Sequence, residues 1–336
     1  HTTVSFMGSF GRGLIAHELA HQWFGDKITC GSWKDIWLNE GFATYLSGLV
    51  IEDFDGNDAF RNWKDQRIDY ITSSTSGSVY LSDQDTTSVS RIFSSRLSYN
   101  KGAMVLHMLR KKIGDLYFYE GMQNYLSDED LSFNYAKTGD YQAIMEAASG
   151  TDLTEFFNDW IYDQGYPSFD IIFTPLSAGQ IMVQVNQTQS HSSVNYFETP
   201  IPIRLIGTGG EMLDLILNNT FNGETFIETV GFEVSNLLFD PEFDIISRNN
   251  NVTLGVKTFD LEKEVKFHPN PTNRYLTIDK PENISILSIQ MYDLLGKKVF
   301  MSDHQNGIDI STFENGLYFI KIQTNNGVLV KRIIKE

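Results

Sequence analysis

The pattern of hydrophobic and polar positions along the chain changes from one period to another near residue 166. Before that point, apolar residues recur at steps of three and four, the spacing of one face of an α-helix. This spacing predicts helices over residues 14–25, 37–50, 58–71, 101–113, 116–126, 140–148 and 153–162. After it, apolar and polar residues alternate in short runs separated by Gly, Asn and Pro, which is typical of strands. The clearest runs are 181–185, 201–206 and 213–217.

These patterns predict a multidomain protein. We expect a mostly α-helical domain over residues 1–166, a β-sandwich domain over 167–258 and a small C-terminal β-sandwich over 259–336. A chain of 336 residues is too long for one modest core, which agrees with two or three domains. The Ser- and Thr-rich stretch 72–96 interrupts the helices, either as a wall of a cleft or as a solvated loop.

The net charge of the chain indicates which classes of partner it can bind. Lys and Arg number 26 against 43 Asp and Glu, a net charge of −17, which argues against nucleic acid as a partner. All of the excess lies in residues 1–258, because residues 259–336 carry ten basic and ten acidic side chains. A negative cleft would favour substrates with a positive amino group, and a solvated acidic surface explains the charge equally well.

The single cysteine, Cys30, excludes an intramolecular disulfide, and we expect it to be a buried thiol. No apolar run approaches the length of a membrane span, so we expect no transmembrane segment. The chain starts at His1, without an initiator Met and without a visible export signal. We therefore expect a signal peptide upstream of this sequence.

The sequence HELAH at residues 17–21 places two histidines four residues apart within a predicted helix. On a helix, His17 and His21 lie one turn apart and present two imidazoles on one face. Glu40 follows after eighteen intervening residues, on the next predicted helix, and can supply a third ligand. Two imidazoles and one carboxylate form the ligand set of a catalytic zinc site. The spacing therefore predicts one bound zinc ion.

Glu18 lies beside the histidine pair without belonging to it. Its carboxylate can take a proton from water whose pKa zinc has lowered to about 7, which is the role of a general base. The alternative is a pair of core histidines, with Glu40 as a solvated helix carboxylate. The presence of all these residues at this spacing favours the zinc hydrolase.

Residues 13–26 (GLIAHELAHQWFGD) and 33–45 (WKDIWLNEGFATY) resemble the gluzincin aminopeptidases related to aminopeptidase N. The resemblance implies a thermolysin-like zinc peptidase domain, with His17, His21 and Glu40 as zinc ligands and Glu18 as the general base. The family also places a tyrosine before x-Lys-Gly at the mouth of the site, and Tyr99 stands in such a setting. The resemblance therefore makes Tyr99 the candidate donor to the tetrahedral oxyanion, since a phenol with a pKa of about 10 stays protonated at neutral pH.

Members of this family carry a β domain and a Gly-rich exopeptidase motif upstream of the zinc helix. Neither is found in this sequence, so we expect it to be the C-terminal part of a longer protein. The resemblance implies zinc-dependent hydrolysis of peptide substrates, with aminopeptidase activity in the full-length protein. The alternatives are a zinc endopeptidase, an epoxide-hydrolase-type enzyme, or a secreted peptide-binding or adhesion protein whose zinc site has no turnover.

The C-terminal segment resembles the sorting domain of type IX secretion cargo. The residues that carry this resemblance are 265–271, 291–299, 316–322 and 330–335. It implies docking to the type IX secretion machinery and a secreted or cell-surface location in a Gram-negative bacterium. The alternative is an immunoglobulin-like spacer with a basic tail.

Side chains near the predicted ligands can orient the imidazoles, because a metal-bound histidine usually donates its second N–H to an oxygen. Asp35, Asn39 and Thr44 are the candidates, and the sequence does not choose among them. His107 lies in the helix after Tyr99, and we expect it to face the core.

Overall fold

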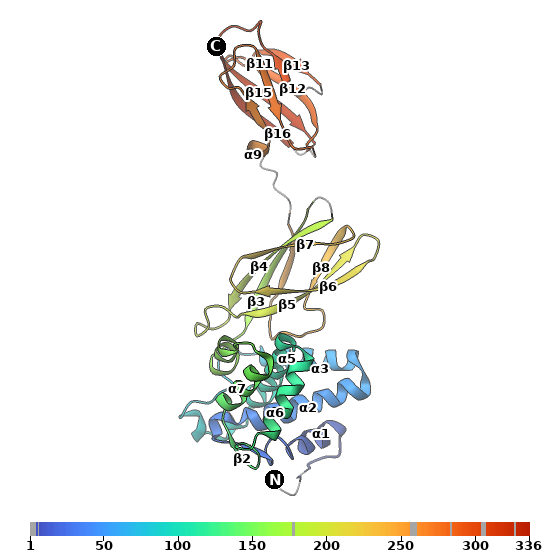
Figure 1. Ribbon diagram of the computed structural model, residues 1–336, viewed down its shortest axis with the longest axis vertical. Coiled ribbons are helices and arrows are strands. Elements are labelled where there is room, and N and C mark those ends of the chain that lie inside the picture. Colours follow the sequence, from blue (N-terminus) through green and yellow to red (C-terminus); the bar gives the residue numbers. More distant parts are fainter. Residues whose placement is uncertain are drawn as a thin grey trace. The chain divides into compact units, whose positions relative to one another are not determined.

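The computed structural model describes residues 5, 7–176, 179–255, 261–282, 284–303, 307–325 and 327–336. The chain divides into two compact units, residues 1–255 and 256–336 (Figure 1). The domain boundary expected between residues 258 and 259 lies outside the described residues. No helix of the described ranges has the length and hydrophobicity needed to cross a membrane.

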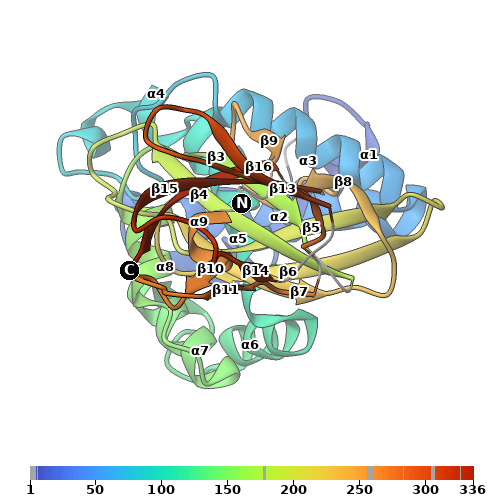
Figure 2. The ribbon, with the colours of Figure 1, turned by 90° about the horizontal axis from the view of Figure 1, so that it is seen from above.

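The first unit begins with helices, and all of its α-helices except Val89–Ile92 form where the three- and four-residue spacing predicts them. The exception lies in the stretch 72–96, where the sequence predicts no helix. The α-helices are α1 (Arg12–Ala20), α2 (Trp37–Asp55), α3 (Asn57–Ile71), α4 (Val89–Ile92), α5 (Gly102–Ile113), α6 (Asp115–Ser127), α7 (Thr138–Ser149) and α8 (Thr154–Phe157). Short 3₁₀ turns η1 (Trp33–Asp35) and η2 (Asp85–Thr87) and π-helical turns η3 (Ser95–Lys101) and η4 (Asn158–Tyr162) complete them. Helices α6 and α7 lie side by side in both views (Figure 1, Figure 2).

Helix α2 is the central helix of this unit. Trp37, Phe42 and Tyr45 are fully buried, and the helix packs against α1, α3 and α5. A helix that is apolar on more than one face is expected to be surrounded by other elements. The helix ends at Asp55, and the next residue, Gly56, has a φ of 83°, a conformation that favours glycine. It therefore runs five residues beyond the predicted end at Val50.

Strands follow the helices. A short parallel pair, β1 (Ile28–Cys30) and β2 (Asn134–Ala136), lies among the helices. The later strands are β3 (Pro167–Pro175), β4 (Gln180–Gln189), β5 (Thr199–Gly207), β6 (Met212–Asn219), β7 (Glu224–Thr229), β8 (Val234–Phe239) and β9 (Asn251–Leu254). They form a four-stranded sheet, β7-β4-β3-β9, and a three-stranded sheet, β6-β5-β8. Alternate residues of β5 are buried, as the alternating pattern predicts.

One hydrophobic core runs through the helices and both of these sheets. Its members include Phe42 and Trp160 from the helices and Ile171 and Ile203 from the strands, all nearly or fully buried. The change of pattern near residue 166 is therefore a change of secondary structure within one core.

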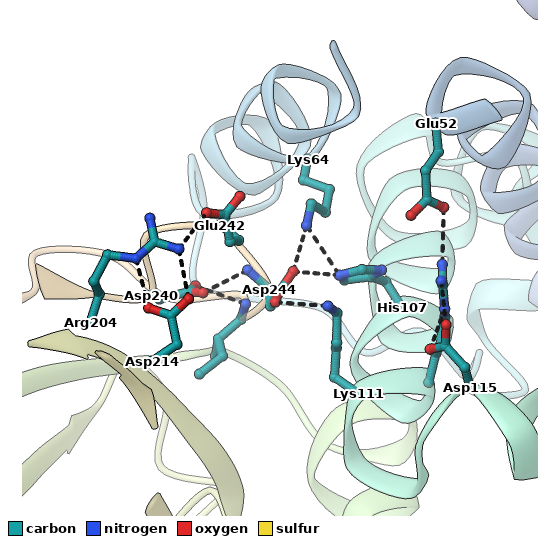
Figure 3. A network of polar contacts seen from close by, with 12 residues as sticks. Glu52, Lys64, His107, Lys111, Asp115, Arg204, Asp214, Asp240, Glu242 and Asp244 are labelled. Atoms are coloured by element: carbon teal, nitrogen blue, oxygen red, sulfur yellow. Dashed lines mark hydrogen bonds and ion pairs between the residues drawn. The ribbon is translucent and has the colours of Figure 1, made fainter. Parts of the chain in front are cut away.

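A buried charge cluster also joins helices to the segment after β8 (Figure 3). Asp244 accepts hydrogen bonds from Lys64 of α3 at 2.5 Å and from His107 of α5 at 2.8 Å, and Lys111 lies 3.2 Å away. The Asp240 carboxylate accepts the backbone N–H of Asp244 at 2.7 Å. His107 is 1% exposed, which confirms its predicted place in the core. Burial lowers the pKa of His107 to about 4, so the imidazole is neutral at pH 7.

The second unit contains a short helix and seven strands within its described residues. They are α9 (Leu261–Glu264), β10 (Lys266–His268), β11 (Tyr275–Asp279), β12 (Ile286–Tyr292), β13 (Lys298–Ser302), β14 (Gly307–Asp309), β15 (Gly316–Thr324) and β16 (Gly327–Lys335). The strands form two sheets, β10-β11-β14 and β13-β12-β15-β16. This unit has its own core, which includes Leu276, Ile289, Ile320 and Ile333.

Candidate active site

Helix α1 presents both predicted histidine ligands. The helix ends at Ala20, five residues before the predicted end, because residues 21–23 form a turn and Gly25 has a φ of 142°. His21 nevertheless keeps a helical conformation (φ −59°, ψ −21°), and its N–H donates to the carbonyl of His17 at 3.3 Å. The one-turn spacing is thus preserved, and the two Nε2 atoms lie 3.2 Å apart.

Glu40, in the first turn of α2, completes the group. Its Oε2 lies 3.4 Å from Nε2 of His17 and 3.4 Å from Nε2 of His21. Three ligands at zinc bond lengths of about 2.0–2.1 Å in tetrahedral geometry would lie about 3.3–3.4 Å apart. The spacing of the three side chains therefore fits a zinc ion. Among the described residues, this is the one group of three or more His, Cys, Asp or Glu side chains arranged to hold a metal ion.

The electrostatics of this group favour an ionised carboxylate. Burial opposes the charge of Glu40, but hydrogen bonds from His17 and His21 outweigh it and lower the pKa of Glu40 to about 2. Glu40 in turn raises the pKa of His21 against the opposing effect of burial. A carboxylate that is ionised at neutral pH is ready to bind a cation.

The partner that orients His21 is a backbone carbonyl. His21 Nδ1 lies 3.0 Å from the Phe24 oxygen and is placed to donate to it. The predicted candidates make other bonds: Asn39 accepts the N–H of Cys30, Thr44 donates to the Glu40 carbonyl and Asp35 accepts from Thr138. The expectation of a side-chain partner among these three is wrong for His21, because the turn after α1 brings a main-chain oxygen to the ring.

Cys30 is less buried than predicted. We expected a buried thiol, and its side chain is only partly buried. It does not belong to the ligand group. Burial and the nearby Asp35 raise the pKa of Cys30 to about 11, so the thiol is protonated at neutral pH.

A cleft of about 540 Å³ opens beside the three ligands. Glu18 and Tyr99 both line it, as do Leu14 and Phe93. The ring of Tyr99 stacks on the imidazole of His17, with centroids 5.9 Å apart and an interplanar angle of 10°. The cleft therefore brings together all five residues that the sequence predicts for the site.

Tyr99 lies on the π-helical turn η3 and is partly buried. Burial and the negative charge of Glu40 raise the pKa of Tyr99 well above its usual value of about 10. The phenol therefore remains protonated at neutral pH and can donate a hydrogen bond into the cleft.

Two glycines that sequence reasoning missed bring the turns of Glu40 and Tyr99 together. A Cβ on Gly41 would lie 3.1 Å from Cα of Gly102, and a Cβ on Gly102 would lie 3.2 Å from Cα of Gly41. The backbones of α2 and α5 are therefore in direct contact next to the site. Each glycine directly follows a residue of the motifs, but a single sequence does not show that the two glycines meet.

A metal-ligand group of two histidines and a glutamate, with a second glutamate and a tyrosine in the same cleft, is the arrangement of a metallopeptidase. Residues 11–160 match the family model described as the peptidase family M1 domain, and residues 266–336 match the secretion system C-terminal sorting domain. Residues 11–160 therefore form an M1 metallopeptidase domain, of the aminopeptidase N type.

Similar proteins are aminopeptidases or proteins associated with a protease. The chain is 33% identical over 182 residues to probable aminopeptidase 2 of Sulfurisphaera tokodaii, covering 51% of this chain and 22% of that protein. It is 30% identical over 221 residues to tricorn protease-interacting factor F2 of Thermoplasma volcanium, covering 62% and 27%. The chain thus spans about a quarter of the length of these relatives.

A solved structure has a similar fold. It is aminopeptidase A of Legionella pneumophila in complex with aspartic acid, with a TM-score of 0.55 and 20% identity, covering 72% of this chain and 26% of that one. This similarity supports the fold of the chain.

Proposed function

We propose that the chain carries the catalytic site of a zinc-dependent peptidase, and that the full-length protein is an aminopeptidase. The observation that carries this proposal is the 3.2–3.4 Å spacing of the ligand atoms of His17, His21 and Glu40 beside a cleft lined by Glu18 and Tyr99. When bound there, zinc supplies a Lewis acid that polarises a carbonyl and acidifies water.

Two side chains of this cleft carry out the proton transfer and the stabilisation of negative charge. Glu18 takes the proton of the attacking water and then gives it to the leaving amine, as a general base and acid. Tyr99 keeps its proton at neutral pH and donates a hydrogen bond to the oxygen that becomes negative in the tetrahedral intermediate. Both residues act on the substrate from the cleft, without being ligands.

The experiment that tests this mechanism is Glu18→Gln in the full-length protein, assayed on an aminoacyl anilide. Gln has nearly the same shape as Glu but does not accept the proton, so we expect activity to fall by about 10²- to 10⁴-fold. Zinc content, measured by atomic absorption, should stay at one ion per chain. Full activity in this variant would exclude Glu18 as the base.

The names of the relatives support aminopeptidase activity over the other hydrolase reactions. An aminopeptidase needs a free amino group on its substrate, so acetylation of the peptide N-terminus should abolish cleavage. Unchanged cleavage of the acetylated peptide would instead indicate an endopeptidase.

The sorting domain indicates export to the cell surface in bacteria of the Bacteroidetes type. We propose that residues 1–166 are the peptidase domain, residues 167–258 a β-sandwich domain and residues 259–336 a β-sandwich that docks to the type IX machinery. The last helical turn ends at Tyr162 and the sheets start at Pro167, so the first division follows the change of secondary structure within the shared core. Deletion of residues 265–336 should leave the protein in the periplasm, detected by cell fractionation, whereas continued surface display would contradict the docking role.

A further inference from the structure

The turn that carries Tyr99 has an unusual backbone. Residues 95–101 form a π-helix, in which each turn holds more residues than in an α-helix. Such turns are rare and occur mostly as single turns, frequently at functional sites. Inside this turn, Asn100 Nδ2 donates to the Ser95 carbonyl at 2.7 Å. Two basic side chains, Arg96 and Lys101, also connect this turn to distant segments of the chain.

Arg96 connects the start of the turn to the end of α3 and to the segment that follows it. Its guanidinium donates to three backbone carbonyls: Nη1 to Ile71 and Ser74, both at 3.2 Å, and Nη2 to Ser76 at 2.5 Å. The planar guanidinium presents several donors in fixed directions, so three carbonyls held by one side chain define its position closely.

Lys101 connects the end of the turn to the junction between helices and strands. The side chain is 1% exposed, and its Nζ donates to the carbonyl of Gly165 at 3.3 Å. Burial, together with the positive charge of Arg96, lowers the pKa of Lys101 to about 7. Burial of an ammonium group is costly, and an aliphatic side chain of similar length would avoid that cost.

The anchor of Lys101 has little freedom to move. Gly165 has a φ of 89°, and a Cβ at this position would lie 2.8 Å from Oγ of Ser190. The next residue, Tyr166, donates its hydroxyl to the Thr72 carbonyl at 2.9 Å, in the same segment that Arg96 holds. The two ends of the Tyr99 turn are therefore fixed to segments that are also joined to each other.

We propose that Arg96 and Lys101 are positioning residues that hold the Tyr99 turn so that the phenol points at the reacting oxygen. Neither residue lines the cleft, so both act through Tyr99. The proposal rests on the role given to Tyr99 under the proposed function. Small misplacements of a catalytic group reduce rates strongly, about 10²-fold for 1 Å.

The test compares Lys101→Met, Tyr99→Phe and the double variant in the zinc-loaded full-length protein. Met fills a similar volume without a donor. We expect Lys101→Met to lower kcat about 10- to 100-fold with KM within about twofold, and to have less than a twofold effect in the Tyr99→Phe background. Lys137→Met, at an exposed lysine of the same unit, is the control and should leave kcat unchanged.

Hydrogen exchange gives a readout that does not depend on activity. In Lys101→Met, the backbone amides of residues 95–101 should exchange at least about tenfold faster in both zinc-loaded and zinc-free protein. Unchanged exchange, or an equal loss of kcat with and without the Tyr99 hydroxyl, would overturn the proposal. If Lys101→Met does not fold, Arg96→Met decides by the same two measurements. Faster exchange together with full activity of Tyr99→Phe would contradict the catalytic role of Tyr99, but it would support the part of the proposal in which Lys101 holds residues 95–101 in place.

Discussion

Replacement of Asp244 by Asn tests the buried charge cluster that joins α3 and α5 to the segment after β8. The change removes the negative charge that Lys64 and His107 contact at 2.5 and 2.8 Å (Figure 3). Asn keeps the volume and one acceptor oxygen but leaves the Lys64 ammonium without its counter-ion in a buried site.

The expected loss of stability follows from burial. The side chains of Lys64 and Asp244 are 5% and 9% exposed, and removal of one partner of a buried ion pair costs about 3–5 kcal/mol. Because Asn still accepts a hydrogen bond, we expect about 3 kcal/mol, at the lower end of that range.

Asp214→Asn is the matched control. Asp214 pairs with Arg204 at 2.6 Å, but the two side chains are 63% and 26% exposed. Exposed pairs contribute about 0–1 kcal/mol, so this variant should stay within about 1 kcal/mol of the parent. The two substitutions make the same chemical change at buried and exposed ion pairs.

The assay is urea unfolding followed by tryptophan fluorescence. All five tryptophans lie in residues 1–255, so the signal reports the first unit and not the second. If Asp244→Asn and Asp214→Asn differ by less than about 1 kcal/mol, burial does not govern the strength of this cluster and the reasoning is wrong.

Two other predictions concern the core and the site. Burial lowers the pKa of His107 to about 4, and an unfolded histidine has a pKa of about 6.5, so the unfolded state binds more protons between these values. The contribution of His107 to stability should therefore fall as the pH drops from 6.5 to 4. Burial raises the pKa of Asp240 to about 7, which acts in the opposite direction, so the test is the difference between parent and variant. The parent should lose more stability over this range, relative to His107→Gln, in urea unfolding at each pH; equal pH dependence of the two would contradict the prediction. Gly41→Ala places a Cβ 3.1 Å from Cα of Gly102 and should lower both Tm and activity. Gly139→Ala, where a Cβ would meet nothing within 4 Å, should not, and equal effects of the two would contradict the contact.

The ligand group could be predicted because most of it is local. The spacing of His17 and His21 follows from helix geometry alone, and it survives even though α1 ends early. Glu40 lies on a helix whose apolar pattern is strong enough to predict its place. For these three residues, the sequence pattern and the packing agree.

The parts that could not be predicted depend on contacts between distant residues or on the main chain. His107 meets Asp244 across 137 positions, and Lys101 meets the Gly165 carbonyl across 64. The oxygen that orients His21 belongs to the backbone of Phe24. No side-chain pattern marks a carbonyl, and no local spacing shows which distant segments meet.

The shared core of residues 1–255 has a consequence for how this protein can be recombined. Phe42 and Trp160 belong to the same hydrophobic cluster as Ile171 and Ile203. A chimaera with a relative, joined near residue 166, would therefore combine part of this core with part of the relative's core. The two parts would not fit each other, and apolar surface of both would be exposed. The second unit has a separate core, so exchange after residue 255 leaves every buried contact of the first cluster intact. The peptidase helices and the sheets that follow them are expected to be inherited together, while exchange of the sorting unit divides neither core.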